Sequence, residues 1–153
     1  METMIRAAVQ GDLSRISEIY AHHVLHGSAS FELEPPSPEE ISQRWEAVVS
    51  QGFPYLVVCR DEHVLGYAYA NHFRTRPAYR FSLENSIYLD PEMRGKGLGT
   101  RLLQALMVEC EAIGARQMIA VIGDSANVAS IALHARCGFR FAGLLRASGW
   151  KHG

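Results

Sequence analysis

The segment between residues 87 and 100 restricts the possible folds of this chain more than any other. A β-rich apolar run ends at Leu89, and a long helical pattern begins at Leu98. Alternating glycines and two cations lie between and just after these points, namely Arg94, Gly95, Lys96, Gly97 and Gly99. Glycines let the backbone approach an anion closely, and a helix N-terminus offers free N–H groups at the positive end of its dipole. We therefore predict a phosphate or pyrophosphate site on a strand–loop–helix unit.

Two common phosphate-binding motifs do not fit this loop. A P-loop requires GxxxxGK[ST], but Lys96 is followed by Gly97, and no glycine stands five residues before Gly95. A dinucleotide fingerprint requires GxGxxG and an acidic residue about 20 residues later on a strand. Residues 115–121 contain no acidic residue. What remains is the pattern Arg-x-x-Gly-x-Gly, from Arg94 to Gly99.

Hydrophobic periodicity divides the rest of the chain into strands and helices. Before the glycine loop we expect a helix capped by Asp12, a helix from Pro38 to residue 51, a bulge at Gly66, and strands at 5–9, 54–60, 64–73 and 80–89. After the loop we expect helices at 98–113 and 126–137 and strands at 118–122 and 139–145.

This order of elements predicts an α/β (α+β) fold, with a mixed, mostly antiparallel sheet and helices on both of its faces. The strand at 80–89, the following helix and the strand at 118–122 form a parallel β-α-β unit. Residues 25–38, which are rich in Gly, Ser and Pro, are expected to form a functional loop. A length of 153 residues fits one domain spanning residues 1–153.

Composition excludes several classes of function. Fifteen Lys and Arg against sixteen Asp and Glu give a net charge of -1, which argues against a nucleic-acid partner. No apolar run approaches the roughly 20 residues that cross a bilayer, and the start lacks the layout of a signal peptide. Cys59, Cys110 and Cys137 are far apart and form no CxxC, so we interpret them as core residues. No membrane partner and a cytoplasmic location are expected.

The glycine loop resembles the acetyl-coenzyme A loop of the GNAT superfamily of N-acetyltransferases. A second block, from Asn127 to Phe139, resembles the Asn…Gly-Phe segment of that superfamily. Within it, the chain is most similar to the phosphinothricin and methionine sulfoximine acetyltransferases. That likeness rests on Ser30-Phe31 with Pro35-Pro36, on residues 83–88 (LENSIY) and on residues 144–153 (LLRASGWKHG).

The resemblance implies acetyl-CoA as the cosubstrate and assigns residues to it. Backbone groups of Ile87, Tyr88 and Leu89 would pair with the pantetheine arm and polarise the thioester. The pyrophosphate and the rest of the cofactor would be held by Arg94, Gly95, Lys96, Gly97, Leu98, Gly99, Thr100, Asn127 and Ser130. Asn127 also suits a plain helix cap, and Arg94 suits a residue that only shapes the loop.

Two residues are expected to move protons. Strand alternation places Glu84 on one face with Ser86 and Tyr88, where its carboxylate can take a proton from the acceptor ammonium. The alternative is a strand glutamate paired with Arg80 or Arg74. Many superfamily members have a tyrosine as general acid where this chain has Leu133-His134, so His134 either takes over that role or packs in the helix.

The resemblance further implies a small amino acid analogue as acceptor, with phosphinothricin, methionine sulfoximine or methionine sulfone as examples, and a homodimer. The carboxylate of such an acceptor needs a cation, for which Arg74 and Arg76 are candidates. Phe31, Thr75, Tyr79, Asn85 and Ser86 complete the expected substrate contacts, and the two aromatic rings also suit simple packing. His22, His23 and His26 lack a second set of ligands, so no metal is expected.

Three alternatives remain at this point. In the first two, the acceptor is a protein N-terminus or a polyamine, and a polyamine would need an acidic pocket. In the third, the chain is a CoA-binding regulator without turnover, although Glu84 argues against that. The superfamily continues with one more strand after the Lys-His-Gly at residues 151–153. The strand at 139–145 is therefore expected to expose an edge or to accept a strand from a partner.

Overall fold

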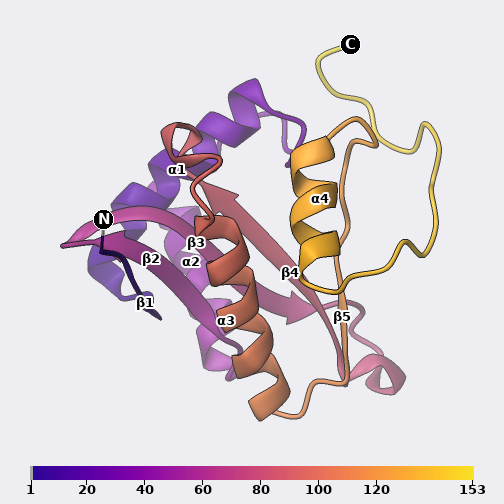
Figure 1. Ribbon diagram of the computed structural model, residues 1–153, viewed down its shortest axis with the longest axis horizontal. Coiled ribbons are helices and arrows are strands. Elements are labelled where there is room, and N and C mark those ends of the chain that lie inside the picture. The colour runs from indigo at the N-terminus through magenta and orange to yellow at the C-terminus, as the bar shows by residue number, and fades with distance from the viewer. Residues whose placement is uncertain (1) are drawn as a thin grey trace.

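An open five-stranded sheet organises the computed structural model, which describes residues 2–153 (Figure 1). The strands lie in the order β1 (Met4–Ala7), β2 (Tyr55–Arg60), β3 (His63–His72), β4 (Ser82–Leu89) and β5 (Gln117–Ile119). The helices are α1 (Leu13–His26), α2 (Pro38–Ser50), α3 (Leu98–Ala112) and α4 (Val128–Arg136). The first four strands are antiparallel and β5 runs parallel to β4. The predicted mixed sheet and its parallel unit, β4–α3–β5, are confirmed.

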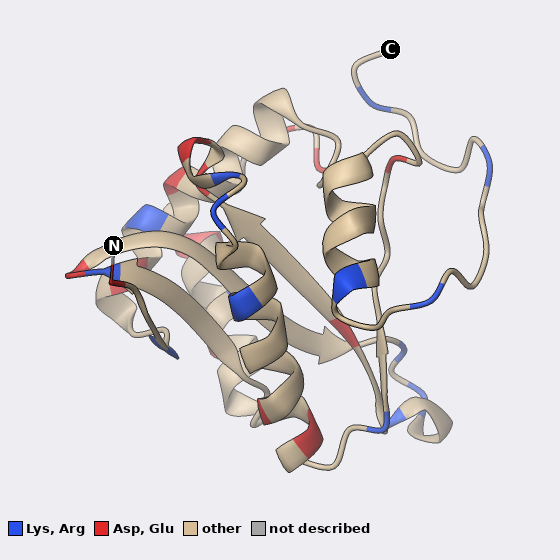
Figure 2. Cartoon of the chain, viewed as in Figure 1, with Lys and Arg blue, Asp and Glu red and all other residues tan. Residues whose placement is uncertain are grey.

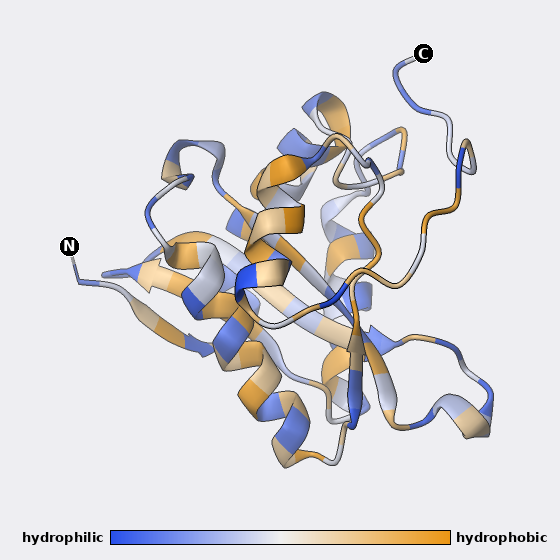
Figure 3. Ribbon diagram, turned by 45° about the vertical axis from the view of Figure 1, so that its right-hand side comes forward, coloured by the Kyte–Doolittle hydropathy of each residue, from blue (hydrophilic) through white to orange (hydrophobic). Residues whose placement is uncertain are grey.

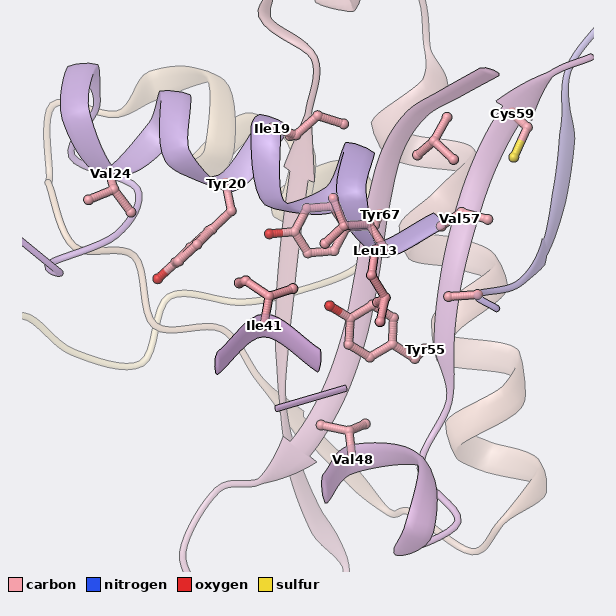
Figure 4. Packing of buried hydrophobic residues seen from close by; sticks show 13 residues of the cluster. Leu13, Ile19, Tyr20, Val24, Ile41, Val48, Tyr55, Val57, Cys59 and Tyr67 are labelled. Atoms are coloured by element: carbon pink, nitrogen blue, oxygen red, sulfur yellow. The ribbon is translucent and has the colours of Figure 1, made fainter. Parts of the chain in front are cut away.

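Helices cover both faces of the sheet, as predicted, because side chains of each strand alternate between two cores. On one face, Val57 and Cys59 of β2 pack with apolar residues of α1 and α2 (Figure 4). On the other, Leu56 and Val58 pack against α3 through Leu98, Leu102, Leu103, Leu106 and Cys110. Hydrophobic residues accordingly recur along the strands and on one side of the helices (Figure 3). Cys59 and Cys110 are buried, as predicted, and Cys137 is half-buried.

The predicted bulge at Gly66 is present. Val58 pairs with Gly66 and Cys59 pairs with Val64, so Leu65 is the additional residue of β3. A Cβ atom at position 66 would lie 3.0 Å from the carbonyl oxygen of Tyr88 and would overlap the side chain of Leu89. Glycine therefore allows β3 to pass close to the end of β4.

Asp12 does not cap α1 in the way that we predicted. A 3₁₀ turn (Gln10–Asp12) precedes the helix, and the carboxylate accepts a hydrogen bond from the Val9 N–H at 2.8 Å. It also pairs with both terminal nitrogens of Arg6, at 2.7 and 2.9 Å. This hydrogen bonding by Arg6 holds the pKa of the buried Asp12 carboxyl below its ordinary value.

Asp12→Asn is expected to lower the free energy of unfolding by about 1.5–3 kcal/mol at neutral pH, because the variant loses a hydrogen-bonded ion pair. The folded-state pKa is depressed, so this stabilisation is complete above the ordinary carboxyl pKa and is lost as the pH falls through the folded-state pKa. Urea unfolding at about pH 7 and about pH 3 measures the effect. The matched control is Asp61→Asn in the exposed β2–β3 turn. A deficit of equal size at both pH values contradicts the prediction.

The prediction of a strand at 139–145 is wrong. This segment has no regular structure and runs outside the sheet, beside α4 (Figure 1). A strand needs a hydrogen-bonding partner, and β5 ends at Ile119, so no strand of the described sheet lies next to the segment. Phe141 and Leu145 are each 86% exposed. Within residues 2–153, none of the helices combines the length and apolar composition that crossing a membrane requires.

Candidate active site

A cavity opens where β4 and β5 separate. The two strands pair at only three positions, the last of which joins Glu84 to Ile119, while β4 continues to Leu89. Beyond that point lies a cavity of about 260 Å³. Its walls are formed by Ala29, Ser30, Phe31, Glu84, Asn85, Ser86, Ile87, Tyr88, Ala120, Val121, Ile122, Gly123, Asn127, Ser130 and His134. Backbone groups of β4 that face away from β3 are therefore available for a ligand.

The glycine loop lies at the far end of β4 and has the backbone geometry of an anion site. Gly95 and Gly97 have φ angles of 74° and 77°, in the left-handed region that favours glycine. The first backbone bond of α3 runs from the Arg101 N–H to Gly97 O, so the preceding N–H groups point out of the helix end. Basic residues flank them (Figure 2). These residues fit a pyrophosphate.

Gly99 brings α3 close to its neighbours. A Cβ atom at this position would already lie 3.4 Å from Leu89 on β4 and from Leu133 on α4. A larger side chain would push the helix N-terminus away from both elements. The three glycines of the loop thus have two functions, since two shape the backbone and the third sets the packing distance.

Three contacts fix the end of β4. The buried His23 of α1 donates from Nε2 to the carbonyl oxygen of Leu89 at 2.8 Å, and burial lowers its pKa. The Asp90 N–H donates to Leu65 O at 2.8 Å, and Arg15 pairs with the Asp90 carboxylate. Sequence reasoning considered His23 only as a metal ligand. Within residues 2–153, no group of three His, Cys, Asp or Glu side chains is arranged to hold a metal ion.

Glu84 presents an unpaired carboxylate to the cavity. It is half-buried, and burial raises its pKa above the ordinary value. Among residues 2–153, no hydrogen bond or ion pair to this carboxylate is present. The expected alternative partners have other contacts, since Arg80 donates to Pro77 O and Arg74 lies over the ring of Phe73. A carboxylate with a raised pKa and a free lone pair is suited to accept a proton near neutral pH.

His134 lies on the opposite wall, in a fixed tautomer. Its Nδ1 lies 2.8 Å from the carbonyl oxygen of Ser130, which only accepts, so Nδ1 carries a proton. Its Nε2 accepts from the Asn85 side-chain amide at 3.1 Å. Burial lowers the pKa of His134, which favours the neutral imidazole. Asn127, two turns before His134, caps α4 by accepting from the Ser130 N–H at 3.2 Å, so its predicted capping role is confirmed.

The loop between α1 and α2 closes the other side of the cavity. Ser28 donates to Asp124 at 3.0 Å, Ser30 bonds Tyr20 at 2.8 Å, and Lys151 donates to Ser30 O at 2.5 Å. The ring of Phe31 lies against Gly123 and Gly149, where side chains would overlap it. The expectation of a functional loop at 25–38 therefore agrees with the placement of this segment.

The predicted site residues divide into three groups. Residues 94–100 form the glycine loop, and one cavity is lined by Phe31, Glu84, Asn85, Ser86, Ile87, Tyr88, Asn127, Ser130 and His134. The loop residues Arg74, Thr75, Arg76 and Tyr79 line a separate hollow of about 520 Å³ with Phe73. Sequence reasoning named none of residues 120–123 as site residues, because apolar side chains and a glycine carry no chemical signal. It also missed Lys151, whose contact with Ser30 spans 121 residues.

Comparison with known proteins identifies the family. The model of the Acetyltransferase (GNAT) family matches residues 17–139, which is most of the chain. The chain belongs to the GNAT acetyltransferase family. It is therefore an acetyl-CoA-dependent N-acetyltransferase, and the family and fold class that the sequence predicted are confirmed.

Several relatives and solved structures of GNAT proteins are highly similar. The phosphinothricin N-acetyltransferase of Alcaligenes faecalis is 50% identical over 149 residues, which are 97% of this chain and 76% of that protein. An L-methionine sulfoximine/L-methionine sulfone acetyltransferase of Pseudomonas paraeruginosa is 39% identical over 155 residues, which cover 100% of this chain and 89% of that protein. A GNAT superfamily phosphinothricin acetyltransferase from Sinorhizobium meliloti, crystallised with AcCoA, has a TM-score of 0.96 at 51% identity and covers 100% of this chain and 83% of that one.

Proposed function

We propose that this enzyme acetylates the α-amine of a small amino acid analogue such as phosphinothricin, methionine sulfoximine or methionine sulfone. The observation that carries the proposal is the unpaired, half-buried carboxylate of Glu84 at the point where β4 and β5 separate. The names of the relatives support this class of acceptor. A base at this position is what an amine acceptor requires, because only the neutral amine is nucleophilic.

Acetyl-CoA supplies a thioester whose acyl carbon the amine attacks. We propose that the N–H groups at the start of α3 hold the pyrophosphate, together with Arg94 and Lys96. Residues 87–89 of β4 then pair with the pantetheine arm through backbone groups that β5 leaves free. Asn127 and Ser130 line the same cavity from α4.

The proton balance assigns Glu84 and His134 to different steps. Glu84 takes one proton from the acceptor ammonium, the amine nitrogen bonds to the acyl carbon and gives up its second proton to solvent, and the carbon–sulfur bond breaks. The departing thiolate then needs a proton, for which we propose His134. That proton must come from Nε2, because the Nδ1–H donates to Ser130 O. His134 therefore acts as an acid only from its imidazolium form, and solvent restores both groups after turnover.

The acceptor carboxylate needs a cation near Glu84. We propose Arg74 and Arg76 for this role, because their loop leads directly into β4. Both arginines line a hollow separate from the cavity that holds Glu84. Substitution of these arginines is therefore the most demanding test of the proposal. Lys151 is the competing cation, because it contacts Ser30 on the wall of the cavity itself.

The remaining proposals concern the assembly and the compartment. We propose a homodimer, supported by exposed apolar side chains near the C-terminal end, including Phe141, Leu145 and Trp150. We further propose that the enzyme acts in the cytoplasm as one GNAT domain. Free thiols at all three cysteines agree with a reducing compartment.

A CoA-release assay across an acceptor panel tests the proposed function. The panel contains phosphinothricin, methionine sulfoximine, methionine sulfone, spermidine, short peptides with free N-termini, and the carboxamide of methionine sulfoximine. The amino acid analogues are expected to be the best acceptors and the carboxamide a poor one. In Arg74→Ala and Arg76→Ala the KM for methionine sulfoximine should rise by about 10–150-fold, the value of one ion-paired hydrogen bond.

The same assay separates the outcomes. Preference for spermidine or peptides contradicts the proposed acceptor class. If both arginine variants keep the wild-type KM while Lys151→Ala raises it, the carboxylate site lies at the C-terminal segment and not at the arginine loop. Acetyl-CoA KM should remain unchanged in all three variants.

A further inference from the structure

Asn85 and His134 meet across the site from two different elements. Asn85 projects from β4 and is 7% exposed, and His134 projects from α4 and is 5% exposed. The Asn85 Nδ2 atom lies 3.1 Å from His134 Nε2. The other polar atom of the same side chain, Oδ1, is buried and has no hydrogen-bond partner among residues 2–153. A buried acceptor without a partner is rare in folded proteins and calls for a functional explanation.

The contacts of the two imidazole nitrogens of His134 explain why one atom of the Asn85 amide is left without a partner. Nδ1 of His134 keeps its proton in every state, because the Ser130 carbonyl oxygen can only accept. Only Nε2 gains or loses a proton. With a lone pair on Nε2, Asn85 must present its Nδ2 donor, and Oδ1 is left over. With a proton on Nε2, Asn85 must present Oδ1, which a half-turn of the carboxamide achieves.

We propose that Asn85 is a positioning residue that sets the proton affinity of His134 by offering a donor to the neutral imidazole and an acceptor to the imidazolium. The ring can then stay in one place while Nε2 gains and loses a proton. In the imidazolium state Oδ1 accepts from the Nε2–H in place of the donation from Nδ2, and this acceptor lowers the cost of charging a buried ring. This inference rests on the proposed role of His134 only for its effect on turnover.

No other described side chain is placed to act as the hydrogen-bond partner of His134 Nε2 in both protonation states. Glu84 and Tyr88 of β4 line the same cavity, but Glu84 alternates to the opposite face of the strand from Asn85. Phe139 packs its ring edge-on at 5.0 Å, and α3 meets α4 through Gly99 and Leu133. Of the other titratable side chains at this end of α4, Arg136 is exposed and the Cys137 thiol donates to Thr100 O. The depressed pKa of His134 is due to burial, which the Ser130 contact offsets in part.

NMR titration of the imidazole carbons in the ligand-free enzyme tests the proposal without relying on activity. Asn85→Leu removes both partners, and the charged state loses more than the neutral one, so the pKa of His134 should fall by about half a unit or more. Asn85→Asp supplies only an acceptor with negative charge, so the pKa should rise by about one unit or more. Opposite shifts from two substitutions of similar size are not expected of a residue that merely fills space.

His23 in the same samples is the matched control. It is buried, and its Nε2 donates to Leu89 O instead of contacting an asparagine, so its titration should not change. Equal shifts in both variants, or none in either, overturn the inference. If one variant fails to fold, as the His23 signal would reveal, the sign of the shift in the other still decides.

The pH profile of kcat separates this inference from the proposed function. If His134 is the acid of the reaction, the alkaline limb of the profile should move with the NMR-derived pKa in both variants. Opposite NMR shifts with an unchanged kcat profile support the role of Asn85 and contradict the role of His134 in turnover.

Discussion

Glu84→Gln is expected to lower turnover by about 100-fold or more, the usual contribution of a positioned general base. Glutamine keeps the shape of the side chain and removes the basic oxygen that faces the cavity. Acetyl-CoA binding should stay close to the wild-type value, because the predicted cofactor contacts lie on the backbone of β4 and on the glycine loop. Stopped-flow or steady-state CoA release, together with acetyl-CoA titration by calorimetry, measures both quantities.

The pH dependence makes this prediction specific. Burial raises the pKa of Glu84, so wild-type kcat should fall as the pH drops through that raised value, where the carboxylate becomes protonated. In the glutamine variant this acidic limb disappears. Its deficit should shrink as the pH rises toward the pKa of the acceptor amine, since the neutral amine then forms without a base.

Glu46→Gln, on the exposed side of α2, is the matched control and should keep wild-type kinetics. Unchanged turnover of Glu84→Gln across the pH range would refute the assignment of the base. A deficit that does not depend on pH would instead indicate that Glu84 binds the acceptor without taking its proton.

The double variant Gly95→Ala/Gly97→Ala should weaken acetyl-CoA binding by about 30-fold or more. Both residues adopt positive φ, which costs an alanine about 1–2 kcal/mol at each position. The loop is exposed, so without ligand it can relax to another conformation. The cost then appears when the ligand demands the original backbone. Calorimetry with acetyl-CoA and the apparent KM for acetyl-CoA report the loss.

Gly52→Ala/Gly114→Ala provides a control with the same backbone strain elsewhere. These glycines have φ angles of 82° and 97°, and an added Cβ meets nothing within 4 Å, as at positions 95 and 97. They end α2 and α3, so the control should lose stability and keep its affinity for acetyl-CoA. Equal losses of affinity in both double variants would show that the loop has no specific role.

Most of the fold could be predicted because its elements carry local signals. Periodic apolar residues located the helices, and α2 begins at Pro38 as predicted, with Ser37 capping it by accepting from the Glu40 N–H. The bulge at Gly66 also follows from a single residue. Asp12 was misread because its carboxylate bonds to Arg6 and Val9, a choice that depends on where β1 places Arg6.

The predicted strand at 139–145 shows the limit of local pattern. Alternation of apolar residues describes a strand only where a neighbouring edge is available, and that edge depends on the course of β5. The resemblance and strand alternation singled out Glu84 and His134, and the structure places both on the walls of one cavity. The pairing of His134 with Asn85, the contact of His23 with Leu89 and the position of Lys151 join residues 49, 66 and 121 apart, and no local pattern reports such contacts.

The short ladder between β4 and β5 has a consequence for the lifetime of the protein. With three residue pairs, the sheet contributes little to holding β5 and α4 against the rest of the molecule. A cosubstrate bound between β4 and α4, as we propose, favours the closed, folded population by mass action, by about 2.7 kcal/mol when its concentration is 100 times its Kd. Degradation of proteins through transiently opened states follows the population of those states. The amount of this enzyme in a cell should therefore depend on the supply of acetyl-CoA as well as on its synthesis.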